Sequence, residues 1–391
     1  MAEPGGGRRL REETSWQRAT ILELFFDLVF VFALNRISLR LSTDFHAGGL
    51  GIAQAVQTLL LALGLWFMWQ TTAALTSRVY PDSRPGRFIV FSSMAGATVM
   101  AVAVPQGFEG RAVVFAGAWS AVRLSRVLLY LLAPRVRTGG SSLPGLLSLA
   151  GSSIPWIAGA LVHDPLLRGG LWGIALAIEF PGFVVGFRRW AGTQVAGEHL
   201  ADRLQQIFLI SLGEAVFVSG RTFSDSDLRF PHGLGFALAF VGIVQLWRIY
   251  FYRAGLVLPR AIAAARDPAR QSVAAALSHL VMISGVVLTG VGFELFISEP
   301  TGQPEPNWLI AILGGPALFL VGRACFELQV FGRISLSRPI GLLTLGLLVP
   351  SGWHVPPVAA GAGASAVLTG IALVDAWRAR RRIAEPAGPL M

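Results

Sequence analysis

Residues 20–41 read TILELFFDLVFVFALNRISLRL, an apolar run that contains two acidic residues, Glu23 and Asp27. As a helix, a run of this length can cross a hydrocarbon layer of about 30 Å. Similar runs recur along the chain and predict an all-α integral membrane protein with about 12 transmembrane helices. The predicted spans are 20–41, 51–75, 88–105, 112–133, 143–162, 169–187, 204–222, 234–254, 272–297, 308–331, 339–353 and 356–378. The eleventh run is short and contains Pro350, which leaves a broken or re-entrant helix open.

Composition agrees with a membrane protein. Hydrophobic residues make up 53% of the 391 residues, charged residues make up 14%, and the mean hydropathy is +0.61. Soluble proteins carry about 25% charged residues. The net charge is +10 and every basic residue is Arg, which we attribute to membrane-flanking side chains that meet anionic lipids. We therefore expect membrane lipids and no nucleic acid as partners.

The distribution of arginines predicts the topology. The termini and the even-numbered connections hold 22 of the 32 arginines, whereas the odd-numbered connections hold 6. Because positive residues stay inside, both termini are expected in the cytoplasm. No small-residue cleavage site follows the first apolar run, so no cleaved signal peptide is expected. A single cysteine, Cys325, excludes an intramolecular disulfide and a thiolate metal cluster, and no cofactor is expected.

Short matches in a common order indicate an internal duplication. Residues 26–31 (FDLVFV) match 213–218 (GEAVFV), and Leu65-Trp66 matches Leu246-Trp247. Further matches join the fourth, fifth and sixth spans to the tenth, eleventh and twelfth. An even number of spans per half predicts two parallel six-helix repeats. The predicted divisions are a cytoplasmic tail 1–19, a first repeat 20–190, a cytoplasmic linker 191–203, a second repeat 204–378 and a cytoplasmic tail 379–391.

Acidic residues inside the predicted spans are candidates for a functional site, because a charge at mid-bilayer is costly and needs a partner. Glu23 and Asp27 are four residues apart on one helical face, so either one is protonated or a cation lies near them. Glu214 stands at the position equivalent to Asp27. We expect Asp27 and Glu214 to face each other across a shared centre, with Glu23 beside them on an ion path. Other ionisable residues in spans are Arg123, Arg126, Glu179, Arg248, His279, Glu294, Arg323, Glu327 and Asp375.

The alternative is that these charges only join helices. In that case Arg123 or Arg126 neutralises Asp27 or Glu23. For Arg323 and Glu327 we favour a structural pair, and for His279 a hydrogen-bonded interior histidine. Glu294 and Asp375 lie toward span ends, where they can reach water.

Two motifs resemble the bacterial low-temperature-requirement protein A family. The first is ELFFDLVFVFA at 23–33, which includes Phe25 and Phe30. The second is His199-Leu200-Ala201-Asp202-Arg203, followed by Leu212-Gly213-Glu214, where the family usually has His-x-x-Glu-Arg and Asp202 is a departure. The resemblance covers essentially the whole chain. It implies a polytopic bacterial membrane protein and little about activity, because the family name records a growth phenotype.

A shorter similarity concerns the first span. Its Glu-x-Phe-x-Asp-x-Val-Phe pattern resembles the first-helix motif of the lysosomal and prokaryotic potassium channels that carry Arg-x-x-x-Phe-Ser-Asp. The motif Arg falls at Ile21 and the motif Ser at Phe26, and Ile210 stands at the position equivalent to Glu23. The similarity therefore implies a shared architecture more than potassium selectivity.

The leading functional hypothesis is a cation or proton channel or transporter with its path between the repeats. The alternatives are a small-solute or lipid transporter, in which the acids only pair with arginines, and a non-transporting membrane stress protein. An enzyme is not expected, because the sequence contains no visible nucleophile–base or metal-ligand set. The sequence does not indicate a homo-oligomer.

Overall fold

A computed structural model describes residues 19–77, 79–132, 151–190, 194–252, 258, 261–262, 265–303 and 305–381. The elements in these residues are helices, as the sequence predicts. They form two compact units, made from the described parts of Met1–Ile37, Ile52–Gln206 and Asp267–Val273, and of Ser38–Gly51, Ile207–Arg266 and Ala274–Met391. Helices α1, α8 and α11 each contribute residues to both units.

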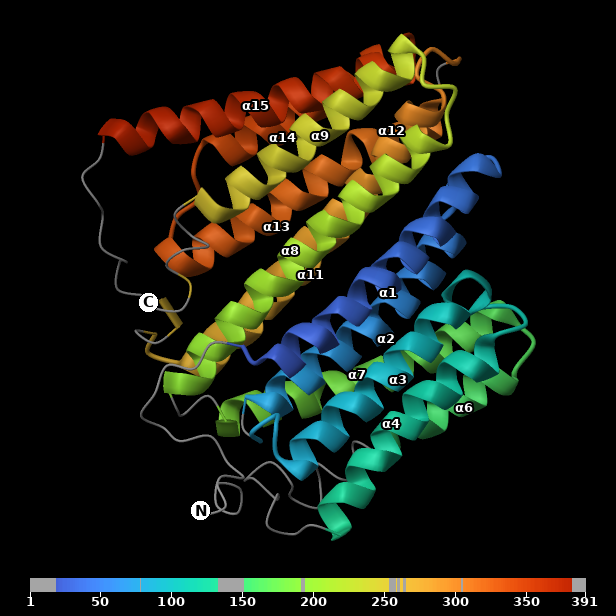
Figure 1. Ribbon diagram of the computed structural model, residues 1–391, viewed down its shortest axis with the longest axis vertical. Helices are drawn as coiled ribbons and strands as arrows, with labels where there is room; N and C mark the ends of the chain where they lie inside the picture. Colours follow the sequence, from blue (N-terminus) through green and yellow to red (C-terminus); the bar gives the residue numbers. More distant parts are fainter. Residues whose placement is uncertain are drawn as a thin grey trace, which may run out of the picture. The chain divides into compact units, whose positions relative to one another are not determined.

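The helices of the first unit pack in a ring. Helix α2 contacts α3, α3 contacts α4, α4 contacts α6, α6 contacts α7, and α7 returns to α2; Figure 1 shows these neighbours side by side. The helices are α1 (Ile21–His46), α2 (Ile52–Thr76), α3 (Arg84–Ala103), α4 (Ala112–Leu132), α6 (Ser153–Leu161), α7 (Pro165–Trp190) and the start of α8 (Gln194–Ser224).

An aromatic core joins three helices of this ring. Trp119 of α4, Trp156 of α6 and Trp172 of α7 are fully buried. Their ring centroids lie 5.3 Å apart for Trp119 and Trp156, and 4.9 Å apart for Trp156 and Trp172. Burial of such large rings is a main source of packing energy, so these three helices form a firm support for the polar groups beside them.

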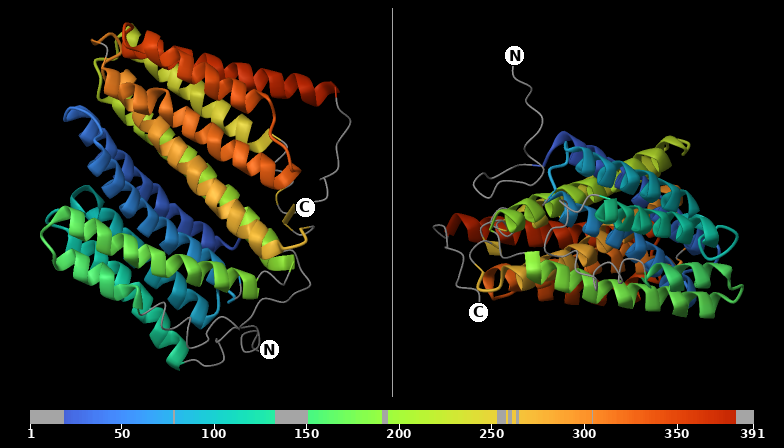
Figure 2. Two further views of the ribbon diagram at one scale, coloured as in Figure 1. Left: turned by 180° about the vertical axis from the view of Figure 1, so that it is seen from behind. Right: turned by 90° about the horizontal axis from the view of Figure 1, so that it is seen from below.

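In the second unit α15 packs along α9 and α14, and α14 packs along α13. The red α15 runs beside the yellow α9 in both Figure 1 and Figure 2. The described residues also contain two short 3-10 helices, Val104–Gln106 and Pro306–Trp308. Besides the ends of α1 and α8, the described helices of the second unit are α9 (Phe230–Tyr250), α11 (Pro268–Ser298), α12 (Leu309–Ile312), α13 (Gly314–Phe331), α14 (Ser337–Gly352) and α15 (Pro357–Arg381).

In the part of the chain that the structure describes, eight helices are long and apolar enough to cross a membrane. They match the second, third, fourth, seventh, eighth, ninth, tenth and twelfth predicted spans. The first span corresponds to the charged helix α1, the sixth to α7 and the eleventh to the 16-residue α14. The fifth predicted span falls partly on residues 143–150, outside the described residues. Helix α14 continues through Pro350, so it is not broken there.

Candidate functional site

Helix α1 begins with a capping box. The Thr20 backbone N–H donates to Glu23 Oε2 at 2.9 Å, and the Glu23 N–H donates to Thr20 Oγ1 at 3.3 Å. This reciprocal pairing satisfies two backbone donors that a helix start otherwise leaves open. Glu23 is fully buried, so one of its oxygens holds the helix start while the other faces the protein interior.

One turn further along α1, two donors hold the carboxylate of Asp27. Arg203 Nη2 lies 2.6 Å from Asp27 Oδ1, and Trp69 Nε1 donates to the same oxygen at 2.7 Å. All three side chains are fully buried. A buried carboxylate is stable only when it is paired and hydrogen-bonded. Arg203 is therefore the cation that the two acids on α1 require.

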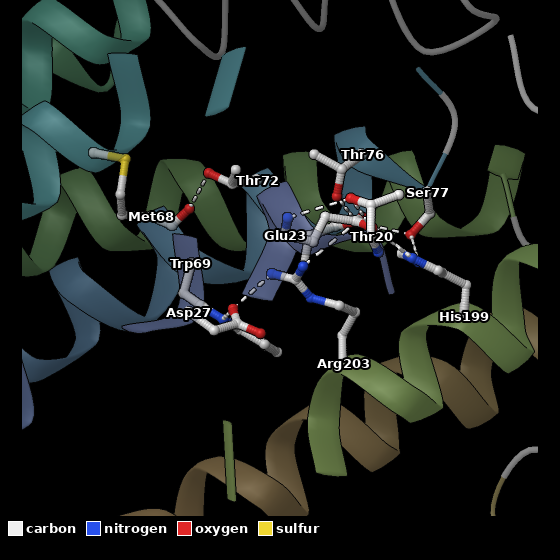
Figure 3. Close-up of polar contacts among 11 residues, drawn as sticks. Thr20, Glu23, Asp27, Met68, Trp69, Thr72, Thr76, Ser77, His199 and Arg203 are labelled. Atoms are coloured by element: carbon white, nitrogen blue, oxygen red, sulfur yellow. Dashed lines mark hydrogen bonds and ion pairs between the residues drawn. The ribbon is translucent and has the colours of Figure 1, made fainter. Parts of the chain in front are cut away.

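His199 extends this cluster to Glu23. It lies one turn before Arg203 on α8, with Nε2 3.2 Å from Glu23 Oε1 and Nδ1 2.7 Å from Ser77 Oγ. Arg203 Nη1 also lies 3.8 Å from Glu23 Oε1. In Figure 3 the acids of α1 face His199 and Arg203 of α8, with Trp69 and Ser77 beside them. The two sequence motifs are therefore in direct contact. Glu23 of the first motif contacts His199 and Arg203 of the second, and Asp27 contacts Arg203.

Helix α8 begins at Gln194 and includes His199 and Arg203. It therefore covers most of the predicted linker 191–203, whose place in the cytoplasm stays a prediction. Arg203 was counted among the membrane-flanking arginines, whereas its side chain is fully buried. Arg203 reaches the acids because it lies one helical turn after His199, on the same face of α8.

Hydrogen bonds around Ser77 define where the cluster holds protons. Ser77 Oγ donates to Ala73 O at 2.7 Å, and a hydroxyl has only one proton to donate. Ser77 then accepts a hydrogen bond from Nδ1–H of His199. With Nδ1 protonated, Nε2 faces the Glu23 carboxyl attractively only if a further proton lies between them, either on the imidazole or on the acid. In this tautomer of His199 a proton lies between Nε2 and the Glu23 carboxyl; in the other tautomer Ser77 donates to Nδ1 and Nε2–H donates to Glu23.

In the tautomer with this proton, the charges of Glu23, Asp27, His199 and Arg203 sum to zero. Glu23 and Asp27 supply two negative charges, Arg203 supplies one positive charge, and the shared proton supplies the second. The Phe26 and Trp69 rings lie 5.7 and 6.0 Å from Arg203 Cζ, which keeps the surroundings apolar. In such surroundings a balanced cluster is strongly favoured over a charged one.

The expected pairing of Arg123 or Arg126 with Asp27 or Glu23 is wrong. Arg123 Nη2 instead lies 2.8 Å from Glu179 Oε2, and Ser152 Oγ donates to the other oxygen of Glu179. Arg126 donates to hydroxyl groups of α2 and α3. These arginines lie on the face of α4 that meets α2, α3 and α7, whereas Arg203 approaches the acids from α8.

A separate network of charges lies in the second unit. The expected pair is present, with Arg323 Nη1 3.2 Å from Glu327 Oε1. Arg338 Nη2 lies 2.8 Å from Glu327 and 2.7 Å from Asp375 Oδ2. Two acids and two arginines are therefore balanced. Asp375 is buried, so the expectation that it reaches water is wrong.

His279 and Glu294 behave differently from each other. His279 Nε2 lies 2.8 Å from the Tyr250 hydroxyl, and Nδ1 lies 2.7 Å from Ala275 O. This confirms a hydrogen-bonded interior histidine. The Glu294 side chain is 13% exposed and lies 3.7 Å from Arg221 Nη2, as expected near a span end.

Glu214 is fully buried on the part of α8 that belongs to the second unit. A Cβ at Gly290 of α11 would lie 3.6 Å from Glu214 Oε2, so this carboxyl lies against α11. Asp27 belongs to the first unit. The expected meeting of Asp27 and Glu214 stays a prediction.

The remaining motif residues have mixed environments. Phe30 is buried, with its ring centroid 5.2 Å from that of Phe26, whereas Phe25 is 52% exposed. Asp202 is half-buried on α8. A Cβ on Gly213 would meet no atom within 4 Å, so close packing does not explain the glycine.

Trp69 and Ser77 were not identified from the sequence as site residues. A tryptophan in mid-span rather than at a span end is a usable signal, because a buried indole N–H needs an acceptor. The Thr20-x-x-Glu23 spacing is likewise a known helix-start signature. Ser77 has no comparable signal. Among the described residues, no group of three or more His, Cys, Asp or Glu could hold a metal ion.

Comparison with known proteins gives a family match over most of the chain. Residues 18–373 match the model described as bacterial low temperature requirement A protein (LtrA). A Rhizobium meliloti (strain 1021) protein named "Uncharacterized protein RA0937" is 35% identical over 330 residues, which cover 80% of this chain and 78% of the relative. No solved structure matches the chain.

Proposed function

The chain belongs to the bacterial LtrA family of multi-pass membrane proteins, and we propose that it conducts or transports protons, or a cation coupled to them. The proposal rests on the Glu23–His199 contact, which holds one proton inside a buried cluster. Ionisable residues within membrane segments are typical of proton relays and ion paths. A group that exchanges one proton while its heavy atoms stay in place suits such a relay.

Two proton states of the cluster are compatible with the same heavy-atom positions. In one, Ser77 donates to Ala73 O and a proton is shared by Glu23 and His199. In the other, the Ser77 hydroxyl turns and donates to His199 Nδ1, and Nε2–H donates to an ionised Glu23. The second state contains one proton fewer. From the first state to the second, His199 releases the proton on Nδ1, the shared proton stays on Nε2, and the Ser77 hydroxyl hydrogen rotates from Ala73 O to Nδ1.

Arg203 lowers the free-energy cost of releasing this proton. Its guanidinium lies 3.8 Å from Glu23 and 2.6 Å from Asp27, so an ionised Glu23 remains next to a positive charge. Asp27 and Trp69 in turn hold Arg203 in place. We propose Glu23 and His199 as the proton-binding pair, with Asp27 and Arg203 as positioning residues.

We also propose the finer architecture of twelve spans in two parallel six-helix repeats, with both termini in the cytoplasm of the bacterial inner membrane. The neighbour order inside each unit supports the repeat. Helix α2 contacts α7, α6 contacts α7 and α4 contacts α6, just as α9 contacts α15, α14 contacts α15 and α13 contacts α14. These are the pairs that the proposed duplication makes equivalent.

Proton flux into liposomes tests the function. We expect purified protein, reconstituted with a pH-sensitive dye inside, to pass protons when a membrane potential is imposed. Glu23→Gln and His199→Gln should reduce this flux to that of empty liposomes. Glutamine keeps the capping box at the start of α1, so the first variant separates charge from folding. His279→Gln, which alters a buried histidine of the second unit, is the control and should retain flux.

The proposal fails if the wild-type protein passes neither protons nor potassium or sodium, or if both variants keep normal flux. The ion pair of Asp27 with Arg203 favours a second candidate, a small-solute or lipid transporter whose buried charges only join helices. Solute uptake that is unaffected by Glu23→Gln would support this candidate.

Ser77, His199 and Glu23 also have the residue types of a hydrolase triad. We propose transport and not an enzymatic activity, because Ser77 Oγ donates to Ala73 O and Glu23 holds a helix start. A fluorophosphonate probe distinguishes the two. Labelling of wild-type protein that is lost in Ser77→Ala would indicate an enzyme.

A further inference from the structure

We propose that Arg126 forms a binding site for a small monovalent anion such as chloride within the first unit. Arg123 and Arg126 lie three residues apart on α4, and both side chains are buried. Within the described residues, Glu179 is the one acid at ion-pair distance from either of them, 2.8 Å from Arg123. The two positive charges of Arg123 and Arg126 are therefore accompanied by one negative charge, that of Glu179.

The charge of this group is +1, and neighbouring sequence does not supply the missing negative charge. Residues 133–150, which connect α4 to α6, contain no Asp or Glu, and neither do residues 180–193. A buried charge without a counterion is strongly destabilising. A bound monovalent anion balances the group, whereas a divalent anion would reverse its charge.

The contacts of Arg126 are to neutral groups. Each hydroxyl that accepts from it donates its own proton to a carbonyl of its own helix, so the hydroxyls act as dipoles and not as counterions. Arg126 donates to Thr71 Oγ1 at 2.8 Å, Thr72 Oγ1 at 2.7 Å and Ser93 Oγ at 3.0 Å, and these donate to Phe67 O, Met68 O and Ile89 O. Figure 3 includes the Thr72–Met68 contact.

Among the described residues, three buried hydrogen-bond donors of this group have no acceptor. These are Nε of Arg123, Nε of Arg126 and the indole Nε1 of Trp119. The Trp119 ring lies 4.4 Å from Arg123 Cζ. Buried donors normally bond to protein, water or an ion. A surplus of donors together with a surplus of positive charge is the chemistry that recognises an anion.

Thermal unfolding of the full-length protein in detergent tests the site. The measurement compares sodium chloride with sodium gluconate at constant ionic strength. Binding to the folded state alone raises the unfolding temperature, so we expect a saturable rise with chloride. Arg126→Met should lose this dependence. Arg111→Gln, which removes an arginine that donates to Val102 O near the surface, should keep it.

A second variant keeps the proposal testable if Arg126→Met does not fold. Thr71 Oγ1 lies 2.8 Å from Arg126, so Thr71→Asp supplies an internal carboxylate in place of the anion. It should unfold at a higher temperature than wild type in gluconate and should not respond to chloride. The absence of a saturable chloride effect in wild type overturns the proposal, and so does an equal effect in wild type and either variant.

Discussion

The carboxylate of Asp27 depends on Arg203, because both are buried and each supplies the charge that the other lacks. Asp27→Asn keeps the shape of the side chain but leaves Arg203 with less negative charge beside it. Breaking one partner of a buried ion pair costs about 3 to 5 kcal/mol. We expect a loss of this size in the free energy of unfolding, measured by chemical unfolding in detergent.

The double variant Asp27→Asn, Arg203→Met distinguishes loss of the ion pair from a change in local packing. If the loss comes from an uncompensated guanidinium, adding Arg203→Met to Asp27→Asn should restore part of the stability. A double variant whose losses simply add would show that the two side chains act independently, which would contradict the ion pair.

Thr20 allows a milder test at the start of α1. Thr20→Ala removes the hydroxyl that accepts from the Glu23 N–H, and loss of such a cap costs about 1 kcal/mol. Thr20→Ser retains the hydroxyl and should unfold like wild type. Equal stability of the two variants, followed by unfolding in detergent, would mean that the capping box does not stabilise α1.

Single side chains show where sequence reasoning succeeds and where it stops. Glu23 and Asp27 are recognisable because charges in an apolar run need partners, and the predicted nearby cation is present. Its identity was not predictable. Arg203 is close in sequence to Arg188 and Arg189, which suggested a membrane-flanking loop. Only the packing of α8 against α1 selects it over Arg123 and Arg126.

At the level of helices, α11 and α13 approach each other at glycines. A Cβ on Gly285 would lie 2.3 Å from the Phe319 backbone nitrogen, and one on Gly315 would lie 2.5 Å from the Thr289 nitrogen. Small residues permit such close helix contacts in membranes. Gly285 lies against Phe319, whereas Thr289, further along α11, lies against Gly315, which is earlier in α13. Helices α11 and α13 are therefore antiparallel.

Substitution of Gly285 therefore tests this contact. Gly285→Ala forces α11 and α13 apart, and overpacking of this kind costs about 1 to 3 kcal/mol. Gly220→Ala on α8 is the matched control, because a Cβ there would meet no atom within 4 Å. We expect unfolding in detergent at lower denaturant for Gly285→Ala, with no loss for Gly220→Ala. Equal effects would argue against close packing at Gly285.

Helices themselves were largely predictable from apolar length, because a long apolar run in a membrane must satisfy its own backbone. Prediction was weaker where local signals compete. Pro350 suggested a break, but it lies in the last turn of α14, which ends two residues later at Gly352, so the N–H bond that proline removes affects only the end of the helix. Gly285 and Gly315 were not predicted as contact residues, because the sequence of one helix does not show which helix packs against it.

For the molecule as a whole, the two units share a neighbour order but differ in their charges. The acids of the first unit depend on His199 and Arg203 of α8, whereas the network of the second unit joins α13, α14 and α15. Arg123 and Arg323 stand at matching positions of the proposed repeats, yet Arg123 pairs with α7 and Arg323 pairs within its own helix. The proposed duplication thus leaves room for the first unit alone to carry the proposed proton chemistry.

The orientation of the whole chain is testable with single cysteines. Cys325 is replaced by serine, and a cysteine is then placed at Asp82, between α2 and α3, or at Asp225, between α8 and α9; both aspartates are exposed. Arg78, Arg84 and Arg87 surround the first site, so the positive-inside rule places it in the cytoplasm and the second site outside. A membrane-impermeant thiol reagent should label Asp225→Cys in cells with an opened outer membrane, and Asp82→Cys only after lysis. The reverse pattern would contradict cytoplasmic termini, and labelling of both sites before lysis would contradict the odd number of spans predicted between them.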